Sequence, residues 1–204
     1  GYEYIVIDML WYGDSAATDF EAFVQDTITE KPHYYLDEFG RLLPDPVKYP
    51  SSINANGFKP LADYIHSLGL KFGVHLLRGL PWQAAEQNMQ IKGTDISAST
   101  IAQPDKGCEW YYGFYGIDMS KPGAQEYYNS VFELFAEWGV DFVKADDVTE
   151  SELIGMRKAI ANCGRPIVFS VVPNDIEQSV LKENSHMART GADFWDKWEM
   201  LKQA

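Results

Sequence analysis

Residues 135–147 read Phe-Ala-Glu-Trp-Gly-Val-Asp-Phe-Val-Lys-Ala-Asp-Asp, and this stretch decides the fold. It joins a helix to a strand through one glycine. The apolar residues before Gly139 recur at helical spacing. This spacing predicts a helix from about Pro122 to Trp138, which Gly139 ends. The segment from Val140 to Asp146, which includes Val140, Phe142 and Val143, predicts the strand. A strand that directly follows an amphipathic helix is the repeating unit of α/β folds.

The same order of elements extends in both directions along the chain. On the amino-terminal side, the sequence predicts a strand at Tyr2 to Asp8, a helix at Lys59 to Leu68 and a strand at Leu70 to Leu76. On the carboxyl-terminal side, it predicts a helix at Glu150 to Asn162, a strand at Pro166 to Val171, a short helix at about Asp175 to Lys182, a weak strand at His186 to Arg189 and a final helix from about Phe194. Strict alternation predicts a parallel sheet with right-handed crossovers.

Two parallel-sheet architectures fit this order: a doubly wound open sheet and a (β/α)8 TIM barrel. There is no G-x-G-x-x-G after the first strand and no G-x-x-x-x-G-K-[ST] anywhere, so neither phosphate-binding fingerprint is present. Polar residues collect at the carboxyl ends of the predicted strands, where barrel active sites form: Asp8, His75, Lys144 with Asp146, Ser170 and Arg189. The pattern favours the barrel. Residues 77–120 are predicted to be a long irregular segment that carries function.

Composition narrows the class of protein. The 204 residues contain 17 Lys plus Arg against 30 Asp plus Glu, a net charge of −13, and 46% hydrophobic residues. These values fit one folded domain and argue against a nucleic-acid or anionic-membrane partner. Cys108 and Cys163 are too few for a disulfide scaffold, so two free thiols are favoured over a single bridge. The histidines lack ligand spacing, and the sequence implies no metal and no cofactor.

The strongest candidate for chemistry is the pair Lys144 and Asp146. Residues two apart in a strand point to the same face, so Phe142, Lys144 and Asp146 share one face. A lysine beside an aspartate favours the ionised carboxylate, which suits a nucleophile. The alternative is a structural ion pair at a strand end. Asp147 is expected to be a turn residue or the N-cap of the next helix.

A second candidate is Asp193, which follows Arg189 at the end of the fifth predicted strand. It lies two βα units after Asp146, so both carboxylates can face one pocket. Two carboxylates across a pocket, one ionised and one protonated, match glycoside hydrolysis. The alternative role of Asp193 is to cap the last helix.

Three further residues are candidates for substrate binding. Asp8 ends the first strand and can hold sugar hydroxyls, while Trp11 offers an aromatic face that stacks on a sugar ring. His75 lies on the site face of the second strand, and a buried, hydrogen-bonded histidine is the alternative there. Two rival functions are a Schiff-base lyase or aldolase that uses the Lys144 amine, and a sugar-binding barrel without catalysis. No G-x-S-x-G motif supports a serine triad.

Longer segments resemble glycoside hydrolase family 27, the α-galactosidase and α-N-acetylgalactosaminidase family. The resemblance is carried by Gly-Tyr-Glu-Tyr-Ile-Val-Ile-Asp at 1–8, by Asp-Glu-Phe-Gly-Arg-Leu-Leu-Pro-Asp-Pro at 37–46 with Tyr49-Pro50, by residues 61–73 and by the stretch 135–146. It covers most of the chain and is weakest over residues 77–118. It implies a retaining, exo-acting hydrolase of terminal α-galactoside-like residues, with a carbohydrate as its partner.

The resemblance also implies a role for single residues. Asp146 corresponds to the family's nucleophile, and Asp193 corresponds to its acid/base. Lys144 and Arg189 correspond to residues that contact the sugar. Asp8 corresponds to the first aspartate of a pair that recognises the 4- and 6-hydroxyls.

Departures from the family pattern leave the sugar open. Met9 replaces the second aspartate of that pair, and His75 replaces a tyrosine. Val171-Val172-Pro173 replaces a Cys-Glu-Trp that helps to read the 2-position, and the cysteine that often follows the nucleophile motif is absent. An α-galactoside, an α-N-acetylgalactosaminide, a β-L-arabinopyranoside or another sugar of related shape are the alternatives.

The resemblance places the strands of this chain at the second through sixth of eight. A complete barrel needs roughly 250 residues. Residues 1–204 are therefore expected to be a partial catalytic domain, without the first βα unit, the last two strands and any carboxyl-terminal β domain. Open strand edges predict that this segment by itself is inactive or poorly stable.

Overall fold

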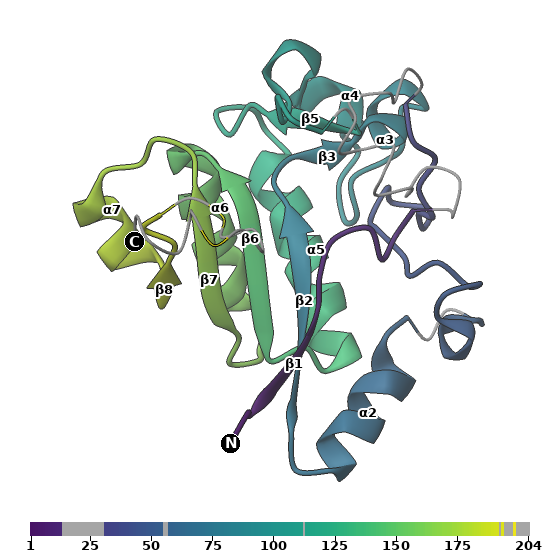
Figure 1. Cartoon of the computed structure of the whole chain (residues 1–204). Helices are drawn as coiled ribbons and strands as arrows, with labels where there is room; N and C mark the ends of the chain where they lie inside the picture. The colour runs from purple at the N-terminus through teal and green to yellow at the C-terminus, as the bar shows by residue number, and fades with distance from the viewer. Residues whose placement is uncertain (14–30, 55–56, 112, 192, 194–197, 199–204) are drawn as a thin grey trace.

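The strand order of the main sheet decides between the two architectures. The computed structural model describes residues 1–13, 31–54, 57–111, 113–191, 193 and 198. Its main sheet contains, in spatial order, five parallel strands: β1 (Tyr4–Ile7), β2 (Lys71–Leu77), β6 (Phe142–Val148), β7 (Val168–Pro173) and β8 (Met187–Ala188) (Figure 1). Spatial order equals chain order, as in a (β/α)8 barrel, whereas a doubly wound sheet reverses its order at a switch point. The predicted partial barrel is confirmed.

Helices connect consecutive strands of this sheet. They are α2 (Lys59–Ser67), α5 (Ala124–Trp138), α6 (Glu150–Asn162) and α7 (Gln178–Asn184). In Figure 1, α5 and α6 lie behind the sheet. The helices and strands predicted from periodicity are confirmed, with ends displaced by a few residues. The final helix predicted from Phe194 lies outside the described residues. None of the described helices is long and apolar enough to span a membrane.

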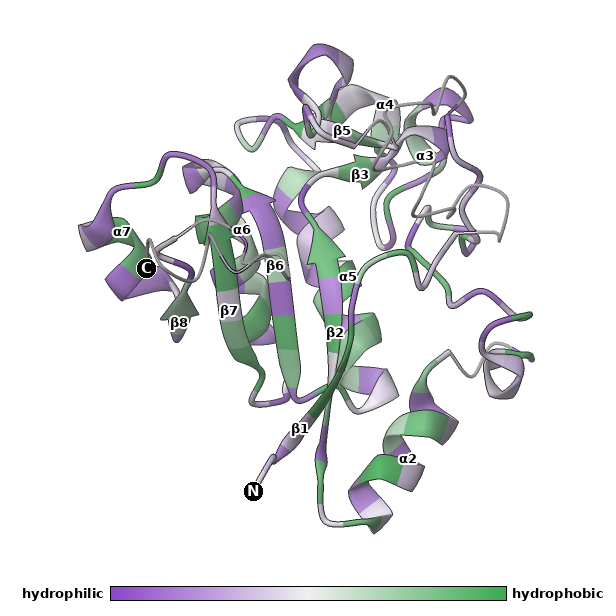
Figure 2. Cartoon of the chain, in the orientation of Figure 1, coloured by the Kyte–Doolittle hydropathy of each residue, from purple (hydrophilic) through white to green (hydrophobic). Residues whose placement is uncertain are grey.

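Side chains alternate between two environments along β6. Val143 and Ala145 are fully buried on the face that the helices cover, whereas Lys144 and Asp146 are half-buried on the opposite face. Figure 2 shows β6 passing from hydrophobic residues at its start to hydrophilic residues at its carboxyl end. The predicted shared face of Lys144 and Asp146 follows from this alternation.

Residues 78–118 are more regular than the sequence predicted. They form an antiparallel sheet of β3 (Leu80–Pro81), β5 (Phe114–Ile117) and β4 (Ala102–Gln103), with the short helices α3 (Trp82–Glu86) and α4 (Ala98–Ile101) and a 3-10 turn at Pro104–Lys106. A further 3-10 turn lies at Pro50–Ser52. We call residues 78–118 the β2–α5 module, and it lies beyond the carboxyl end of β2 (Figure 1). Elements of two to five residues are too short to show a period, so the sequence could not reveal them.

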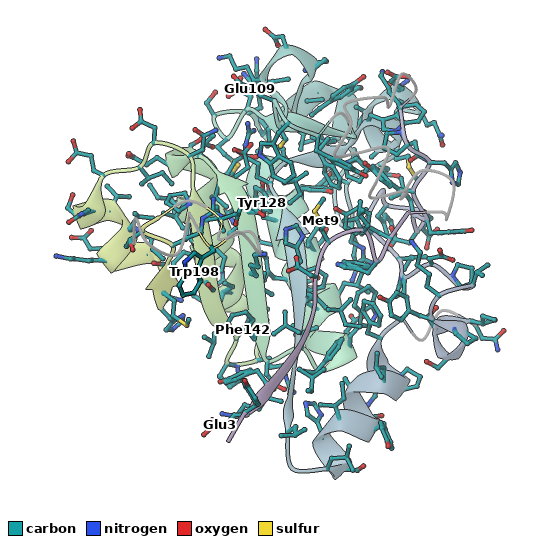
Figure 3. The ribbon with its side chains drawn as sticks, viewed as in Figure 1. Glu3, Met9, Glu109, Tyr128, Phe142 and Trp198 are labelled. Atoms are coloured by element: carbon teal, nitrogen blue, oxygen red, sulfur yellow. The ribbon has the colours of Figure 1, made fainter. Side chains whose placement is uncertain are left out.

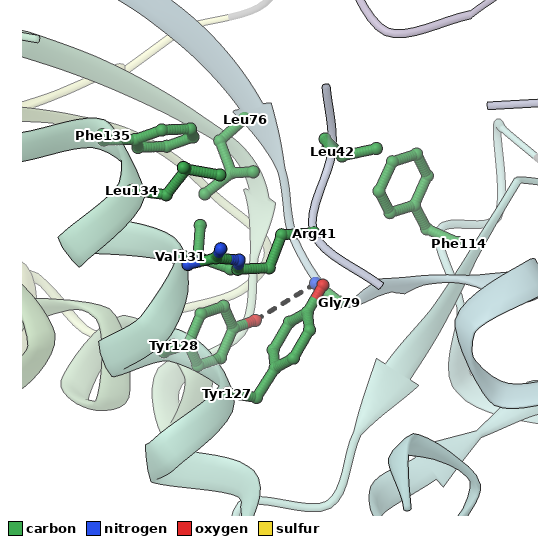
Figure 4. Close-up of a pocket in the computed structure, with 10 residues that line it drawn as sticks. All are labelled: Arg41, Leu42, Leu76, Gly79, Phe114, Tyr127, Tyr128, Val131, Leu134 and Phe135. Carbon is green, nitrogen blue, oxygen red and sulfur yellow. Dashed lines mark hydrogen bonds between the residues drawn. The ribbon is translucent and has the colours of Figure 1, made fainter. Parts of the chain in front are cut away.

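Aromatic packing fixes the loop after β1 onto α5. The Trp11 ring contacts Phe58 and Trp138 edge to face, with ring centroids 5.2 Å and 6.0 Å apart. A cavity of about 10 Å³ lies nearby between α5 and the β2–α5 module, and the Gly79 N–H beside it donates to the Tyr128 hydroxyl at 3.1 Å (Figure 4). This volume holds at most one water molecule, so the cavity is a packing defect and not a sugar site.

Both cysteines are free thiols, as the sequence favoured. Cys108 is buried in the β2–α5 module, and Cys163 is half-buried after α6.

Candidate active site

The register of the sheet brings the candidate residues to one edge. His75 lies opposite Lys144, and Leu77 lies opposite Asp146. Asp8 directly follows β1, which pairs with β2. These residues therefore meet at the carboxyl end of parallel strands, which is where barrel active sites form.

Asp146 is the most enclosed carboxylate of this group, with a side chain that is 14% exposed. Its Oδ2 lies 3.2 Å from His75 Nε2, and its Oδ1 accepts the backbone N–H of Asp147 at 2.9 Å. Burial raises the pKa of Asp146, but the hydrogen bond and charge of His75, the charge of Lys144 and the Asp147 N–H outweigh burial, so the pKa lies below its usual value. The carboxylate is therefore ionised at neutral pH, the state that a nucleophile needs.

Lys144 contacts Asp8 rather than Asp146. Its Nζ lies 3.1 Å and 3.3 Å from the two carboxylate oxygens of Asp8. Burial raises the pKa of Asp8. The charge of His75, the Met9 N–H and Lys144 lower it by more than burial raises it, so the pKa lies below its usual value. The lysine thus joins the ends of β1 and β6 while it also favours the ionised form of Asp146. Met9 directly follows Asp8, and Figure 3 shows it beside β2.

His75 and Trp11 are buried beneath the edge and not open to it. The His75 side chain is 0% exposed, and its Nδ1 has no hydrogen-bond partner in the part of the chain that the structure describes. The Trp11 indole N–H donates to the His75 backbone carbonyl at 2.8 Å, and Trp11 is 1% exposed. Trp11 has no free face in this structure, so stacking on a sugar ring, the role expected from sequence, does not fit. Its placement supports the backbone of β2 at His75.

Arg189 and Asp193 form an ion pair after the carboxyl end of β8, the outer strand on the far side of the sheet from β1. The Arg189 backbone N–H donates to Val171 O at 2.8 Å, which fixes the residue beside β7. Arg189 Nη1 lies 2.5 Å from Asp193 Oδ1, and the two side chains are 40% and 61% exposed. The helix that Asp193 was alternatively expected to cap lies outside the described residues. Both side chains are therefore exposed to solvent in the part of the chain that the structure describes.

Asp147 is neither a turn residue nor the N-cap of α6, contrary to expectation. It lies within β6, at a one-residue shift in the pairing with β7, and its φ is +55°. The N-cap position of α6 is Thr149. Asp147 instead accepts a hydrogen bond from Arg78, a residue that the sequence did not single out. Arg78 follows β2, and its partner Asp147 lies in β6, 69 residues away in the sequence. No local sequence pattern predicts such a contact.

Comparisons with known proteins agree on one family. A family model described as "Alpha galactosidase A" matches residues 112–204. The chain is 28% identical to an α-N-acetylgalactosaminidase of Gallus gallus, with 98% of this chain and 38% of the relative aligned. It is also 28% identical to α-galactosidase A of Cellvibrio japonicus, with 97% and 36% aligned.

A solved structure is similar over the whole chain. The wild-type family-27 β-L-arabinopyranosidase of Geobacillus stearothermophilus is 44% identical, with a TM-score of 0.89 over 100% of this chain and 48% of that chain. The α-galactosidase I of Mortierella vinacea, at 22% identity and a TM-score of 0.58, shares the fold. The chain spans less than half the length of these relatives.

Proposed function

Because the chain belongs to glycoside hydrolase family 27, we propose that the full-length protein is a retaining exo-glycosidase of the α-galactosidase type. The observation that carries the proposal is the ionised, hydrogen-bonded carboxylate of Asp146 at the carboxyl end of β6. Residues 1–204 supply a part of its catalytic barrel.

Asp146 is the nucleophile of the proposed reaction. One of its carboxylate oxygens attacks the anomeric carbon, and the bond from that carbon to the leaving oxygen breaks. Asp193 acts in its protonated form, without the ion pair to Arg189 that the structure has, and donates its proton to the leaving oxygen. Asp193 then removes a proton from water, whose oxygen displaces Asp146 from the sugar and restores both carboxyl groups. This two-step route retains configuration and needs carboxyl groups about 5–5.5 Å apart in the complete enzyme.

The remaining site residues bind the sugar in this proposal. Lys144, Asp8 and Arg189 offer one cation, one carboxylate and one guanidinium at the carboxyl ends of β6, β1 and β8. The Lys144–Asp8 pair is only part-buried, with side chains 32% and 65% exposed, so sugar hydroxyls can compete for its hydrogen bonds. His75 orients Asp146 from below.

The sugar is a terminal residue with the shape of α-D-galactose. A β-L-arabinopyranoside is a specific second candidate, because that pyranose has the ring hydroxyls of galactose without its hydroxymethyl group. The 44% identity to a β-L-arabinopyranosidase supports it. Met9, which stands where the family has a hydroxyl-binding aspartate, supports it as well, because a thioether does not replace a carboxylate as a strong acceptor.

A panel of aryl glycosides tests the proposal in the full-length protein. We expect hydrolysis of the aryl α-D-galactoside or the aryl β-L-arabinopyranoside, and NMR of the first product should show the anomer of the substrate. Asp146→Asn should abolish turnover while the circular dichroism spectrum is unchanged. Retained activity in this variant, or an inverted product, would refute the proposed mechanism.

A Schiff-base lyase is less well supported. The Lys144 amine is in an ion pair with Asp8, an arrangement that suits an ammonium ion and not a free nucleophilic amine. Borohydride reduction in the presence of a carbonyl substrate separates the two classes, because only a lyase would leave Lys144 alkylated. Calorimetric sugar binding without hydrolysis of any aryl glycoside would instead indicate a binding barrel.

A further inference from the structure

A bulge in β6 aims a backbone donor at Asp146. The pairing of β6 with β7 passes from Ala145 opposite Val171 to Val148 opposite Pro173, so β6 holds one extra residue. Asp147 takes up this residue with φ +55°, a conformation that non-glycine residues rarely adopt. In this conformation its N–H donates to Asp146 Oδ1 at 2.9 Å. The orientation of the Asp146 carboxylate therefore depends on a strained neighbour.

Two side chains hold this strained residue, Arg78, which is buried, and Asn174, which is exposed. Asp147 Oδ2 accepts Arg78 Nε at 3.0 Å, and Asp147 Oδ1 accepts Asn174 Nδ2 at 3.0 Å. The backbone N–H of Arg78 also donates to Asp146 O at 3.1 Å. Arg78 and Asp147 are 5% and 9% exposed, so water does not compete for their ion pair. Strain in a backbone persists when the surroundings over-determine it, and these contacts do so.

Arg78 is itself fixed by groups from other elements. Its Nη1 and Nη2 donate to the carbonyls of Lys106 and Gly107, each at 2.9 Å, and Nη1 also lies 3.5 Å from Glu152 Oε2 on α6. A Cβ on Gly107 would lie 2.2 Å from Phe114 O, so only glycine allows this close approach of the loop. The planar fork of an arginine satisfies such a set of acceptors, and a lysine does not.

We propose that Arg78 and Asp147 are positioning residues for Asp146: their buried ion pair holds the β6 bulge that directs the Asp147 N–H onto the Asp146 carboxylate. The inference rests on the proposed role of Asp146 as nucleophile. In this proposal the β2–α5 module positions Arg78, because the carbonyls of Lys106 and Gly107 in the module accept hydrogen bonds from it.

The test uses the double variant Arg78→Met/Asp147→Asn of the full-length protein. It removes both charges of the Arg78–Asp147 pair together, and asparagine tolerates a positive φ. Glu152 loses its contact with Arg78 but keeps the hydrogen bonds that the Tyr128 and Thr149 hydroxyls donate to it. We expect the pKa of Asp146 to rise, as measured by 13C NMR of labelled aspartate carboxyls with Asp146→Asn for assignment. We also expect kcat to fall about tenfold or more, with KM within about threefold, as for a misplaced nucleophile.

The matched control is Arg41→Met/Asp37→Asn. Arg41 is 6% exposed, and its Nε lies 2.7 Å from Asp37 Oδ2, so the same change is made in a part-buried pair away from the site. We expect this control to lose stability and to keep the pKa of Asp146 and the value of kcat. Equal values of the Asp146 pKa in both double variants would overturn the proposal.

Further outcomes are also decisive. If the Arg78 double variant does not fold, Asp147→Asn keeps the arginine with Glu152, and an unchanged Asp146 pKa there overturns the proposal. A full-length protein that hydrolyses no glycoside refutes the proposed function, and the NMR titration still decides the positioning because it needs no turnover.

Discussion

At the scale of single residues, His75 has the largest local effect on Asp146. Its imidazole is fully buried. Burial raises the pKa of the Asp146 carboxyl, and the Nε2 hydrogen bond and the charge of His75 are the two largest contributions that lower it. Without them, burial dominates and the pKa of Asp146 rises. The proposed nucleophile must be ionised, so in the proposed enzyme the pH below which activity is lost depends on His75.

We therefore predict that His75→Phe moves the acidic limb of the kcat/KM profile to higher pH in the full-length protein. A pH series with an aryl glycoside measures the limb. His66→Phe is the matched control, because His66 contacts Asp141 in the same way, at 2.7 Å, at the opposite end of the sheet. An unshifted limb in His75→Phe, or an equal shift in the control, would contradict this role.

At the scale of elements, Asp141 ties several of them together at the end of the sheet opposite the site. Its Oδ2 binds His66 Nε2 on α2 at 2.7 Å and the Phe72 N–H of β2 at 2.9 Å. Its Oδ1 lies 2.5 Å from Arg165 Nη2, and Arg165 Nε donates to Val140 O at 2.9 Å. Asp141 directly precedes β6, so these contacts set where that strand begins.

We predict that Asp141→Asn lowers the free energy of unfolding by about 2 kcal/mol at neutral pH, the usual cost of losing charge-assisted hydrogen bonds. Burial raises the pKa of Asp141, but the Phe72 N–H, His66 and Arg165 outweigh it, so the folded pKa lies below the unfolded value. The stabilisation is thus present above about pH 4 and is lost as the pH falls through the folded pKa. Urea unfolding of both proteins at neutral pH and at about pH 3 measures this. A difference that does not shrink at low pH would count against the assignment.

The elements also show what the sequence can and cannot reveal. The 15-residue helix α5 shows a clear apolar stripe, and Gly139 ends it with φ +82°, so its prediction depended on local signals that survive folding. The β2–α5 module has strands and helices of two to five residues, which are held by contacts distant in sequence. Such elements have no period to read.

The same limit applies to the site. The Lys-x-Asp spacing at Lys144 and Asp146 predicted a shared face, which the structure has. The pairing of Lys144 with Asp8 and the burial of Trp11 depend on how the loop after β1 packs, and no local pattern reports that. Asp147 was expected to be a turn residue or an N-cap and lies instead in the β6 bulge, which depends on pairing with β7 that no local pattern reports.

At the scale of the whole molecule, the described strands form an open sheet with exposed apolar residues on β1. Ile5 is 44% exposed and Val6 is 38% exposed, on a strand whose second edge has no partner among the described strands. Exposed edges and apolar residues favour association with other chains. We predict that residues 1–204 expressed by themselves are aggregated or poorly stable and hydrolyse no glycoside. Size-exclusion chromatography with light scattering measures the state, and a soluble, active monomer would contradict this expectation.

The central claim concerns the full-length protein: Asp146 forms the covalent glycosyl-enzyme. The most direct measurement is mass spectrometry of a proteolytic digest after reaction with a 2-fluoro aryl glycoside of the preferred sugar, which slows the second step and traps the intermediate. We expect one added sugar on the peptide that contains Asp146, and no added sugar in Asp146→Asn. A label on Asp193, on Lys144 or on any other residue would contradict it.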